Sequence, residues 1–460
     1  MGVDSIFRAY DIRGVFGEDL TEETAERLGA AFGEFVGEGR TVVVARDVRL
    51  SGEALRDALV SGLRRSCDVI DVGMTSTPML FYAVNHLEKD AGIMITASHN
   101  PKEWNGFKLF SPEGAIYGED MEWLKRRTKS VSLEERAIRG GLNLYEGIIE
   151  DYIDFVLRQV EVGRRMNVVL DTANGVCGLI APPLFKRLGC NVITINEEPD
   201  GNFPAHEPEP KEETLSELKE TVLKTNADFG VGFDGDGDRA VFVDEEGKVI
   251  PGDVALMVFI EHILRENPGG KVVFEVSCSM AVEEFIRKFG GVPVVERVGH
   301  TFMMQRMRSE GAVLGGEKSS HFYFKELRGM DDAVYASVKM AEILSESELS
   351  LSDIVSTLPK YHSIYEENIE CPDALKFTVI ERLKEKFFSS GFKVNDLDGV
   401  KLIDEDGWVL LRASNTQPLI RVSVEARTQK KLEELHSFAL SELKSVLEDC
   451  RVAGGDPSRR

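Results

Sequence analysis

Cysteines are few in this sequence, and long apolar runs are absent. The six cysteines among 460 residues are not closely paired, which argues against a zinc ribbon and against a disulfide framework. No apolar run reaches the roughly 18 residues that a membrane span requires, because Glu261 interrupts the longest candidate, residues 254–264. The first residues contain no apolar segment followed by a small-residue cleavage site. We therefore expect a cytoplasmic protein with free thiols and no membrane partner.

Basic residues are also scarce relative to acidic ones. The chain has 55 Lys and Arg against 79 Asp and Glu, a formal net charge of -24. Binding to nucleic acid or to an acidic membrane surface relies on basic patches, so neither partner is expected. An anionic substrate would need a local cluster of Arg and Lys. The length predicts three or four domains.

Strand and helix patterns alternate in three successive segments, which predicts three α/β units. Each segment ends in a polar loop directly after an apolar strand: Ser98 follows the first, Asp234 the second and Glu317 the third. Ligands bind at the carboxyl ends of strands in α/β sheets. These three loops are therefore candidates to meet in one cleft.

The pattern changes near residue 370 to a helix, several strands and a long helix from Thr428. This arrangement predicts a smaller α+β domain at the C-terminal end. We place the domain boundaries near residues 150, 252 and 368. The predicted units are α/β domain I at 1–150, α/β domain II at 151–252, α/β domain III at 253–368 and α+β domain IV at 369–460.

The segment "DGDGDR", residues 234–239, alternates three aspartates with glycines. Three carboxylates in this pattern can surround one small cation, because the glycines let the backbone turn without Cβ clashes. Hard oxygen ligands favour magnesium. The alternative is a solvated Asp-Gly turn or a loose calcium loop, although no glutamate stands at the EF-hand spacing.

Ser98 lies in "TASHNP", residues 96–101. These residue types are common in turns, and the glycines of a hydrolase "GxSxG" elbow are absent. A phosphoserine next to magnesium explains the loop better than a hydrolase nucleophile does, because the metal and nearby cations can stabilise a transferring phosphoryl group. Arg13, Lys108 and Arg239 are the candidate cations, although a lone charge is more often a solvated side chain.

Two further loops have the composition of ligand-binding segments. "GGEKSSH", residues 315–321, offers Glu317, Ser319 and His321, which suit sugar hydroxyls and proton transfer. "RASNTQP", residues 412–418, combines a fork-shaped cation, two hydroxyls and an amide, which suit a phosphate. An ordinary loop with a capping serine is the alternative for the first segment.

Six segments in this order resemble the signatures of the α-D-phosphohexomutase superfamily, closest to its phosphomannomutase/phosphoglucomutase branch: "FRAYDIRG", "TASHNP", "WNGFK", "FDGDGDR", "GEKSSH" and "RASNT". They cover nearly the whole chain. The resemblance implies four domains around a central cleft. It also implies a Mg2+-dependent enzyme that interconverts hexose 6-phosphate and hexose 1-phosphate, of mannose or glucose, through a phosphoserine and a hexose 1,6-bisphosphate that also serves as activator.

The resemblance also implies a role for particular residues. One Mg2+ per chain would be held by phosphorylated Ser98, Asp234, Asp236 and Asp238. The reaction centre would be lined by Arg13, His99, Lys108 and Arg239, with the general acid and base left open. The substrate would be bound by Tyr10, Gly299, His300, Glu317, Ser319, His321, Arg412, Ser414, Asn415, Thr416 and Arg421.

Some positions depart from the pattern of this branch. Ser277 stands where a lysine is frequent, Ser320 where a glycine is usual, and Gln417 where many members have glutamate. The segment "PLIRVSVEA" also resembles the phosphoglucosamine mutase branch. A phosphoglucosamine mutase, a non-catalytic sugar-phosphate sensor and a metal hydrolase are the alternatives that the sequence leaves open. In every one of these readings the partner is a small phosphorylated molecule, and the sequence does not indicate an oligomeric state.

Overall fold

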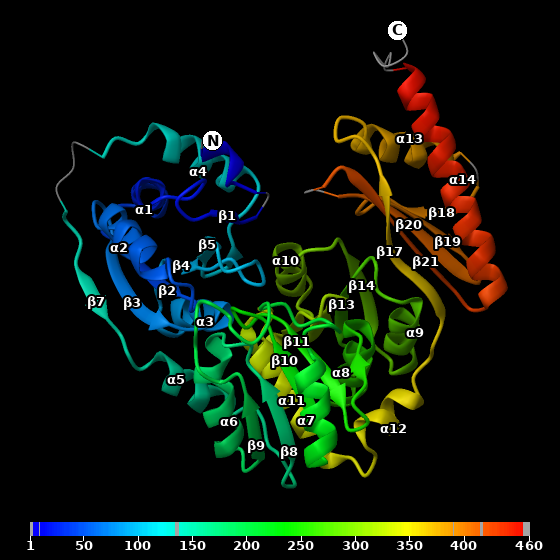
Figure 1. Ribbon diagram of the computed structural model, residues 1–460, viewed down its shortest axis with the longest axis horizontal. Coiled ribbons are helices and arrows are strands. Elements are labelled where there is room, and N and C mark those ends of the chain that lie inside the picture. The colour runs from blue at the N-terminus through cyan, green and yellow to red at the C-terminus, as the bar shows by residue number, and fades with distance from the viewer. Residues whose placement is uncertain (1–2, 9, 134–137, 390, 415–416, 454–460) are drawn as a thin grey trace.

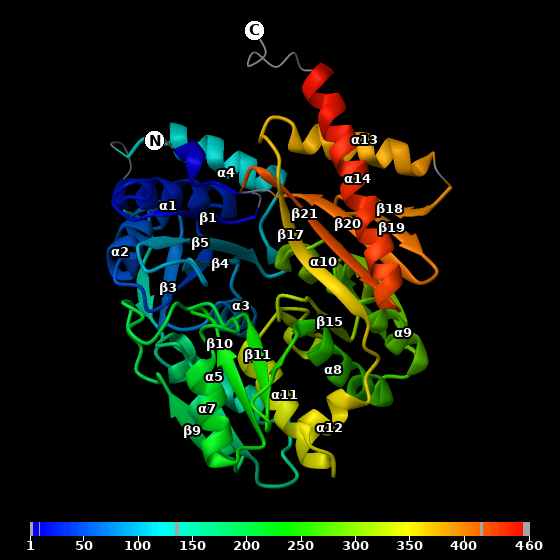
Figure 2. The same ribbon diagram turned by 45° about the vertical axis from the view of Figure 1, so that its right-hand side comes forward.

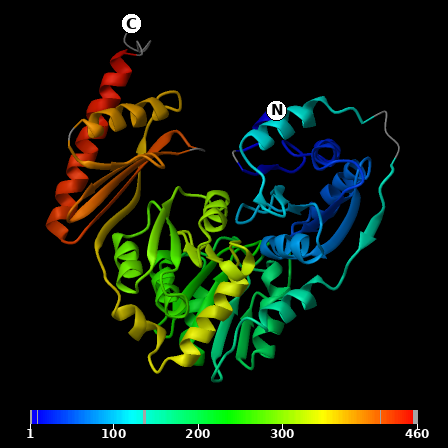
Figure 3. The same cartoon turned by 180° about the vertical axis from the view of Figure 1, so that it is seen from behind.

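Four β-sheets follow one another along the chain, each with its own helices, in the computed structural model of Figure 1. The structure describes residues 3–453 except 9, 134–137, 390 and 415–416. Domain I, in blue, and domain IV, in orange and red, form two opposite arms above domains II and III. The view from behind in Figure 3 shows the same arrangement. No helix in the described part of the chain is long and apolar enough to span a membrane.

Domain I contains a seven-stranded sheet in the order β1-β5-β4-β2-β3-β7, with β6 paired to β5. Helix α1 begins after Thr21, whose hydroxyl accepts a hydrogen bond from the backbone of Thr24, as the sequence predicts. Gly29 and Gly62 let α1 and α2 pack closely, because a Cβ at either would lie about 2 Å from a carbonyl oxygen of the other helix. The elements are η1 Val3–Ser5, β1 Ile12–Val15, α1 Glu22–Val36, β2 Thr41–Arg46, α2 Gly52–Leu63, β3 Asp68–Met74, α3 Thr77–His86, β4 Ala91–Ile95, β5 Trp104–Ser111, β6 Gly114–Ala115, α4 Glu119–Ser130 and β7 Leu142–Leu144.

Domain II contains a five-stranded sheet in the order β12-β11-β10-β8-β9. Strands β8, β9 and β10 are parallel, whereas β10 and β11 form an antiparallel pair whose connection is the acidic loop 234–239. The elements are α5 Ile148–Val156, β8 Asn167–Asp171, η2 Val176–Leu179, α6 Ala181–Arg187, β9 Asn191–Ile195, α7 Ser216–Thr225, β10 Phe229–Phe233, β11 Ala240–Asp244 and β12 Val249–Ile250.

Domain III contains a four-stranded sheet in the order β14-β13-β15-β16. One cluster of buried apolar side chains runs from α3 of domain I through domain II into domain III, so these parts share a core. The elements are α8 Gly252–Glu266, β13 Lys271–Glu275, α9 Met280–Lys288, β14 Val292–Glu296, α10 His300–Glu310, β15 Leu314–Gly316, β16 Phe322–Phe324, η3 Lys325–Leu327, α11 Ala333–Glu346 and α12 Leu351–Ser356.

Domain IV has a five-stranded sheet in the order β17-β21-β20-β19-β18 and its own apolar core. Strand β17 runs from the end of α12 into this sheet (Figure 2), so the sheet begins before the boundary predicted near 368. Helix α5 likewise crosses the boundary predicted near 150. The elements are β17 His362–Glu370, α13 Lys376–Phe388, β18 Lys393–Asn395, β19 Val400–Asp404, β20 Gly407–Ala413, β21 Leu419–Ala426 and α14 Gln429–Ala453. The predicted fold class, three α/β domains followed by an α+β domain, is confirmed.

Candidate active site

The three polar loops that follow β4, β10 and β15 meet in one place. The Ser98 hydroxyl donates to Asp234 Oδ2 at 2.9 Å, which joins the loops of domains I and II. Arg239 and His321 form a β-bridge, and Ala240 N donates to the carbonyl oxygen of Ser320, which joins domains II and III. The three loops that the strand-end rule singled out therefore meet, as expected.

Ser98 has an unusual backbone conformation and a buried side chain. Its φ is 51°, in the left-handed region that a non-glycine residue adopts only where its surroundings hold it there. The Ser98 side chain is buried, and its Oγ lies 3.1 Å from Nδ1 of His99. Ser98 is thus a turn residue whose hydroxyl points into the acidic loop instead of into solvent.

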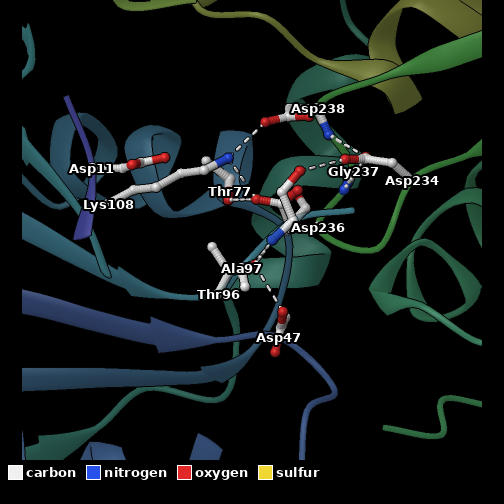
Figure 4. A network of polar contacts seen from close by, with 12 residues as sticks. Asp11, Asp47, Thr77, Thr96, Ala97, Lys108, Asp234, Asp236, Gly237 and Asp238 are labelled. Atoms are coloured by element: carbon white, nitrogen blue, oxygen red, sulfur yellow. Dashed lines mark hydrogen bonds and ion pairs between the residues drawn. The ribbon is translucent and has the colours of Figure 1, made fainter. Parts of the chain in front are cut away.

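Two aspartates of the acidic loop contact the ammonium of Lys108, which comes from β5 (Figure 4). Lys108 Nζ donates to Asp236 Oδ2 and to Asp238 Oδ2, both at 2.7 Å. The Thr77 hydroxyl donates to the same oxygen of Asp236 at 2.5 Å. Asp234 Oδ1 accepts the backbone N–H groups of residues 237–239, which fixes the turn.

The buried carboxylates fit a small divalent cation. One oxygen of each of Asp234, Asp236 and Asp238 lies within 4.8 Å of the others. Asp236 Oδ1 is buried and has no hydrogen-bond partner among the described residues, and an unsatisfied buried carboxylate oxygen is costly unless a cation approaches it. An all-oxygen donor set of this kind suits magnesium. The three aspartates can therefore bind a metal ion.

The electrostatics of the site shift the pKa values of two of its histidines, His99 and His321, in opposite directions. The positive charge of Arg239, together with burial, holds the pKa of His99 well below its usual range, so that His99 is neutral. Burial also opposes a charge on His321, but the neighbouring Asp238 raises the pKa of His321 above its ordinary value. Although burial alone would raise it, Lys108 and His321 hold the pKa of Asp238 well below its usual range. An ionised carboxylate is the form that binds a cation.

Arg13 and Tyr10 approach the same centre from the N-terminal arm. Arg13 Nε donates to Asp11 Oδ2 at 2.7 Å, and its Nη1 donates to Asn100 Oδ1 at 2.6 Å, so its guanidinium lies against the Ser98 loop. The Tyr10 ring meets the ring of His300 edge-on at 5.9 Å between centroids.

The sugar loop predicted from the sequence is held by contacts within domain III. Glu317 Oε2 accepts a hydrogen bond from Gly299 N at 3.1 Å, and its Oε1 accepts one from the Tyr323 hydroxyl. His321 Nδ1 lies 2.9 Å from the Ser319 hydroxyl. Ser320 has a φ of 68°, which explains why glycine is the usual residue at this position.

In domain IV, Arg412 and Arg421 face each other on β20 and β21. Glu366 accepts from both, with Arg412 Nη2 at 3.0 Å and Arg421 Nη1 at 2.8 Å. Asp398 Oδ2 accepts from Arg412 Nη1 and from Val298 N, both at 3.2 Å, which ties this arginine pair to domain III.

The rest of the predicted phosphate loop is only partly described. The Ser414 hydroxyl accepts from Gln417 N at 3.2 Å. The predicted site residues Asn415 and Thr416 lie outside the described residues. Ser277, one of the departures, uses its hydroxyl to donate to Glu275.

Sequence reasoning missed several residues that contact the predicted ones. Thr77 and Glu366 each contact a predicted site residue across a long sequence separation, and no local pattern marks them. Tyr323 was missed although it lies only six residues after Glu317, to which it donates. Asp47 and Arg49 were also missed, although they follow strand β2 directly. The strand-end rule that singled out Ser98 applies to them equally.

Four profiles of one family match the chain in order. They are described as phosphoglucomutase/phosphomannomutase alpha/beta/alpha domain I at residues 4–134, domain II at 150–247, domain III at 251–361 and the C-terminal domain at 366–440. Together with the site they define an intramolecular phosphotransferase. The chain belongs to the phosphoglucomutase/phosphomannomutase family.

Individual relatives agree with this assignment. A phosphomannomutase/phosphoglucomutase of Pseudomonas syringae is 40% identical over 97% of this chain and 96% of its own length. A probable phosphoglucosamine mutase of Methanopyrus kandleri is 37% identical over 97% of this chain and 99% of its own length. A phosphoglucomutase/phosphomannomutase family protein of Burkholderia thailandensis is 35% identical, and its crystal structure superposes with a TM-score of 0.90, covering 97% of this chain and 98% of that one.

A more distant structure shares the fold alone. It is the N-acetylphosphoglucosamine mutase of Aspergillus fumigatus, in complex with GlcNAc-6P and magnesium, which is 16% identical with a TM-score of 0.59 and covers 96% of each chain.

Proposed function

We propose that this protein is a Mg2+-dependent phosphohexomutase that interconverts the 6-phosphate and the 1-phosphate of mannose or glucose through phosphorylated Ser98 and a hexose 1,6-bisphosphate. The observation that carries this proposal is the position of Ser98, whose Oγ lies 2.9 Å from Asp234 Oδ2 inside a buried acidic and cationic centre. A sugar phosphate substrate supports a cytoplasmic location.

The transfer needs two half-reactions. In the first, the bond between phosphorus and Ser98 Oγ breaks while a new bond forms from phosphorus to the free hydroxyl oxygen of the sugar phosphate. The hydroxyl proton leaves to a base, and Ser98 Oγ regains a proton. In the second, the sugar has turned round, and a bond forms from Ser98 Oγ to the other phosphorus while the bond from that phosphorus to the sugar oxygen breaks. The sugar oxygen takes up a proton, and the Ser98 proton leaves to a base, for which neutral His99, 3.1 Å away, is the candidate.

Cations of this chain surround the transferring group. Lys108 and Arg13 lie on the domain I side, and Arg239 lies on the domain II side next to His321. Asp234, Asp236 and Asp238 would hold Mg2+, which when bound neutralises charge on the phosphoryl group. The magnesium in the Aspergillus complex supports the choice of ion.

The phosphate that is not reacting requires an anchor that serves both orientations. Arg412 and Arg421 supply two guanidinium groups that one carboxylate, Glu366, already bridges. Because phosphate offers the same kind of bidentate acceptor as a carboxylate, it can take over these donors. Glu317, Ser319 and His321 would contact the sugar hydroxyls between the two phosphate positions.

Mass spectrometry of Ser98 after incubation with glucose 1,6-bisphosphate tests the proposal. The peptide containing Ser98 should gain a phosphate, and Ser98→Ala should keep the fold and lose most mutase activity. Ser111→Ala, in the same domain, is the matched control and should behave as the wild type. An unlabelled Ser98 peptide in active enzyme would reject the mechanism.

Phosphoglucosamine mutase is the alternative substrate assignment, which the 37% identity to the Methanopyrus relative supports. Turnover of glucose, mannose and glucosamine 6-phosphates at equal concentration separates the two. A sensor would turn over none of the three, and a hydrolase would release inorganic phosphate in excess of isomer.

A further inference from the structure

Arg49 is completely buried beneath the Ser98 loop, and all five of its guanidinium N–H groups have acceptors. Nη2 donates to the carbonyl oxygens of Ser98 and Asn100, at 2.8 and 2.6 Å. Nη1 donates to the carbonyl oxygens of Pro101 and Trp104, at 2.7 and 2.8 Å. Nε donates to a carboxylate oxygen of Asp47 at 3.1 Å. No other side chain has this planar, five-donor geometry.

Asp47 completes the support from the other side of Ser98. Its carboxylate accepts from Arg49 N at 2.9 Å and from the Thr96 hydroxyl at 2.7 Å. The Thr96 oxygen in turn accepts from Ser98 N at 2.9 Å. Figure 4 shows Thr96 beside Asp47. The N–H and the C=O of Ser98 are therefore both tied to the same buried ion pair.

The support extends into domain II. The Phe203 ring lies over the guanidinium of Arg49, with 5.3 Å from Cζ to the ring centroid. A Cβ at Gly235, in the acidic loop, would lie 2.7 Å from the Ser98 carbonyl oxygen. The Ser98 carbonyl is thus confined between Arg49 and the backbone of the loop that carries the aspartates.

The contacts of Asp47 and Arg49 with the Ser98 backbone bear on phosphoryl transfer and not on sugar binding. Ser98 has a left-handed φ, so its backbone needs external support to stay in place. Neither Asp47 nor Arg49 contacts the sugar loop or the arginine pair of domain IV through any hydrogen bond described by the structure. A displacement of about 1 Å between reacting groups can cost about a hundredfold in rate.

We propose that the Asp47–Arg49 pair is the positioning device that sets Ser98 Oγ at its distance from the three aspartates and thereby sets the rate of phosphoryl transfer. The pair contacts no substrate and acts through the backbone of Ser98. This inference rests on the proposed role of Ser98 as the phosphoryl carrier.

Arg49→Lys tests the pair, because lysine keeps the charge and has only three donors on one nitrogen. With glucose 1-phosphate, Mg2+ and glucose 1,6-bisphosphate, we expect kcat to fall about ten- to a hundredfold while KM changes less than about threefold. Arg46→Lys, at the end of strand β2 three residues before Arg49 and paired with Glu53, is the matched control and should change neither constant. An unchanged kcat per folded molecule, or a rise in KM alone, would overturn the proposal.

Thr96 offers a milder test that does not depend on removing the buried arginine. Thr96→Val removes the acceptor for Ser98 N, whereas Thr96→Ser keeps it. We expect the valine variant to transfer radioactive phosphate from Ser98 to glucose 1-phosphate at least about tenfold more slowly in a single turnover, and the serine variant to recover the wild-type rate. Equal rates for the two variants would contradict the proposal even if both were less stable.

The same measurements separate this inference from the proposed function. If wild-type Ser98 takes up no phosphate from glucose 1,6-bisphosphate, the carrier role fails and the positioning role fails with it. If wild-type Ser98 is labelled and transfers its phosphate, while Arg49→Lys and Thr96→Val do so at the wild-type rate, only the positioning role fails.

Discussion

Replacing Lys108 with methionine should make stability depend strongly on magnesium. The Lys108 ammonium is buried and lies 2.7 Å from one oxygen of Asp236 and one of Asp238. Methionine has a similar length and no charge, so Lys108→Met leaves the three buried aspartates without this cation. Removing one partner of a buried ion pair costs about 3–5 kcal/mol.

Magnesium should recover part of this loss. An ion that binds only the folded state stabilises it by about 2.7 kcal/mol at a hundredfold excess over its Kd. The variant also lacks the positive charge that repels Mg2+ from the site, so Mg2+ should bind it more tightly than it binds the wild type. We therefore expect the difference in stability between the two proteins to be smaller with magnesium than with EDTA, by about 1 kcal/mol or more.

Calorimetric unfolding of both proteins, at one scan rate in EDTA and in magnesium, measures this difference. Because a chain of four domains need not unfold in one step, the transition that shifts with magnesium in the wild type is the one to compare. Lys125→Met is the matched control, since Lys125 lies 3.6 Å from Asp4 in a more exposed pair and should give the same small change in both conditions. An equal difference for Lys108→Met with and without magnesium would refute the assignment of the aspartates as ligands.

Three further predictions concern other parts of the molecule. Arg412→Ala should weaken binding of both the 1-phosphate and the 6-phosphate about ten- to a hundredfold in calorimetric titrations, and an effect on one isomer alone would contradict a shared anchor. Glu317→Gln should lower kcat/KM less for a 3-deoxy or a 4-deoxy hexose phosphate than for the natural substrate, and an equal loss with both analogues would place its role elsewhere. Burial raises the pKa of Asp332 to about 7 from 3.8, so its contribution to stability is present at low pH and is lost as the pH rises through 7. Asp332→Asn should therefore be more stable than the wild type at pH 8, with the difference closing toward pH 5 in urea unfolding.

The elements that the sequence predicts well are those in which apolar residues recur with a clear periodicity. Helix α1 begins after Thr21 as expected, and the long helix expected from Thr428 begins at Gln429. The sequence did not predict strand β17, because its residues, "HSIYEENIE", are largely polar and lie at the edge of the sheet. Its position depends on pairing with β21, and the paired residues lie between 49 and 64 positions apart, a separation that no local pattern encodes.

The residues of the candidate site also divide into those that the sequence predicts and those that it does not. The strand-end loops of Ser98, Asp234 and Glu317 were predicted to meet, and they do so in space. Thr77 and Glu366 could not be predicted, because each contacts a partner that only the fold brings to it. The sequence marks Ser320 as a departure from the usual glycine. Its left-handed φ gives the physical reason why glycine is usual at this position.

In the proposed function, a strongly negative chain would bind a phosphorylated sugar through cations that are already paired with carboxylates. Arg412 and Arg421 share Glu366, Arg13 contacts Asp11, and Lys108 lies between two aspartates. A phosphate that enters the site therefore exchanges one anionic partner for another instead of meeting a bare cation, which limits the net gain in free energy. A moderate gain suits the proposed reaction, because the bisphosphate must leave both phosphate positions, turn round and bind again in each cycle. Tight, unpaired cations would hold it in one orientation.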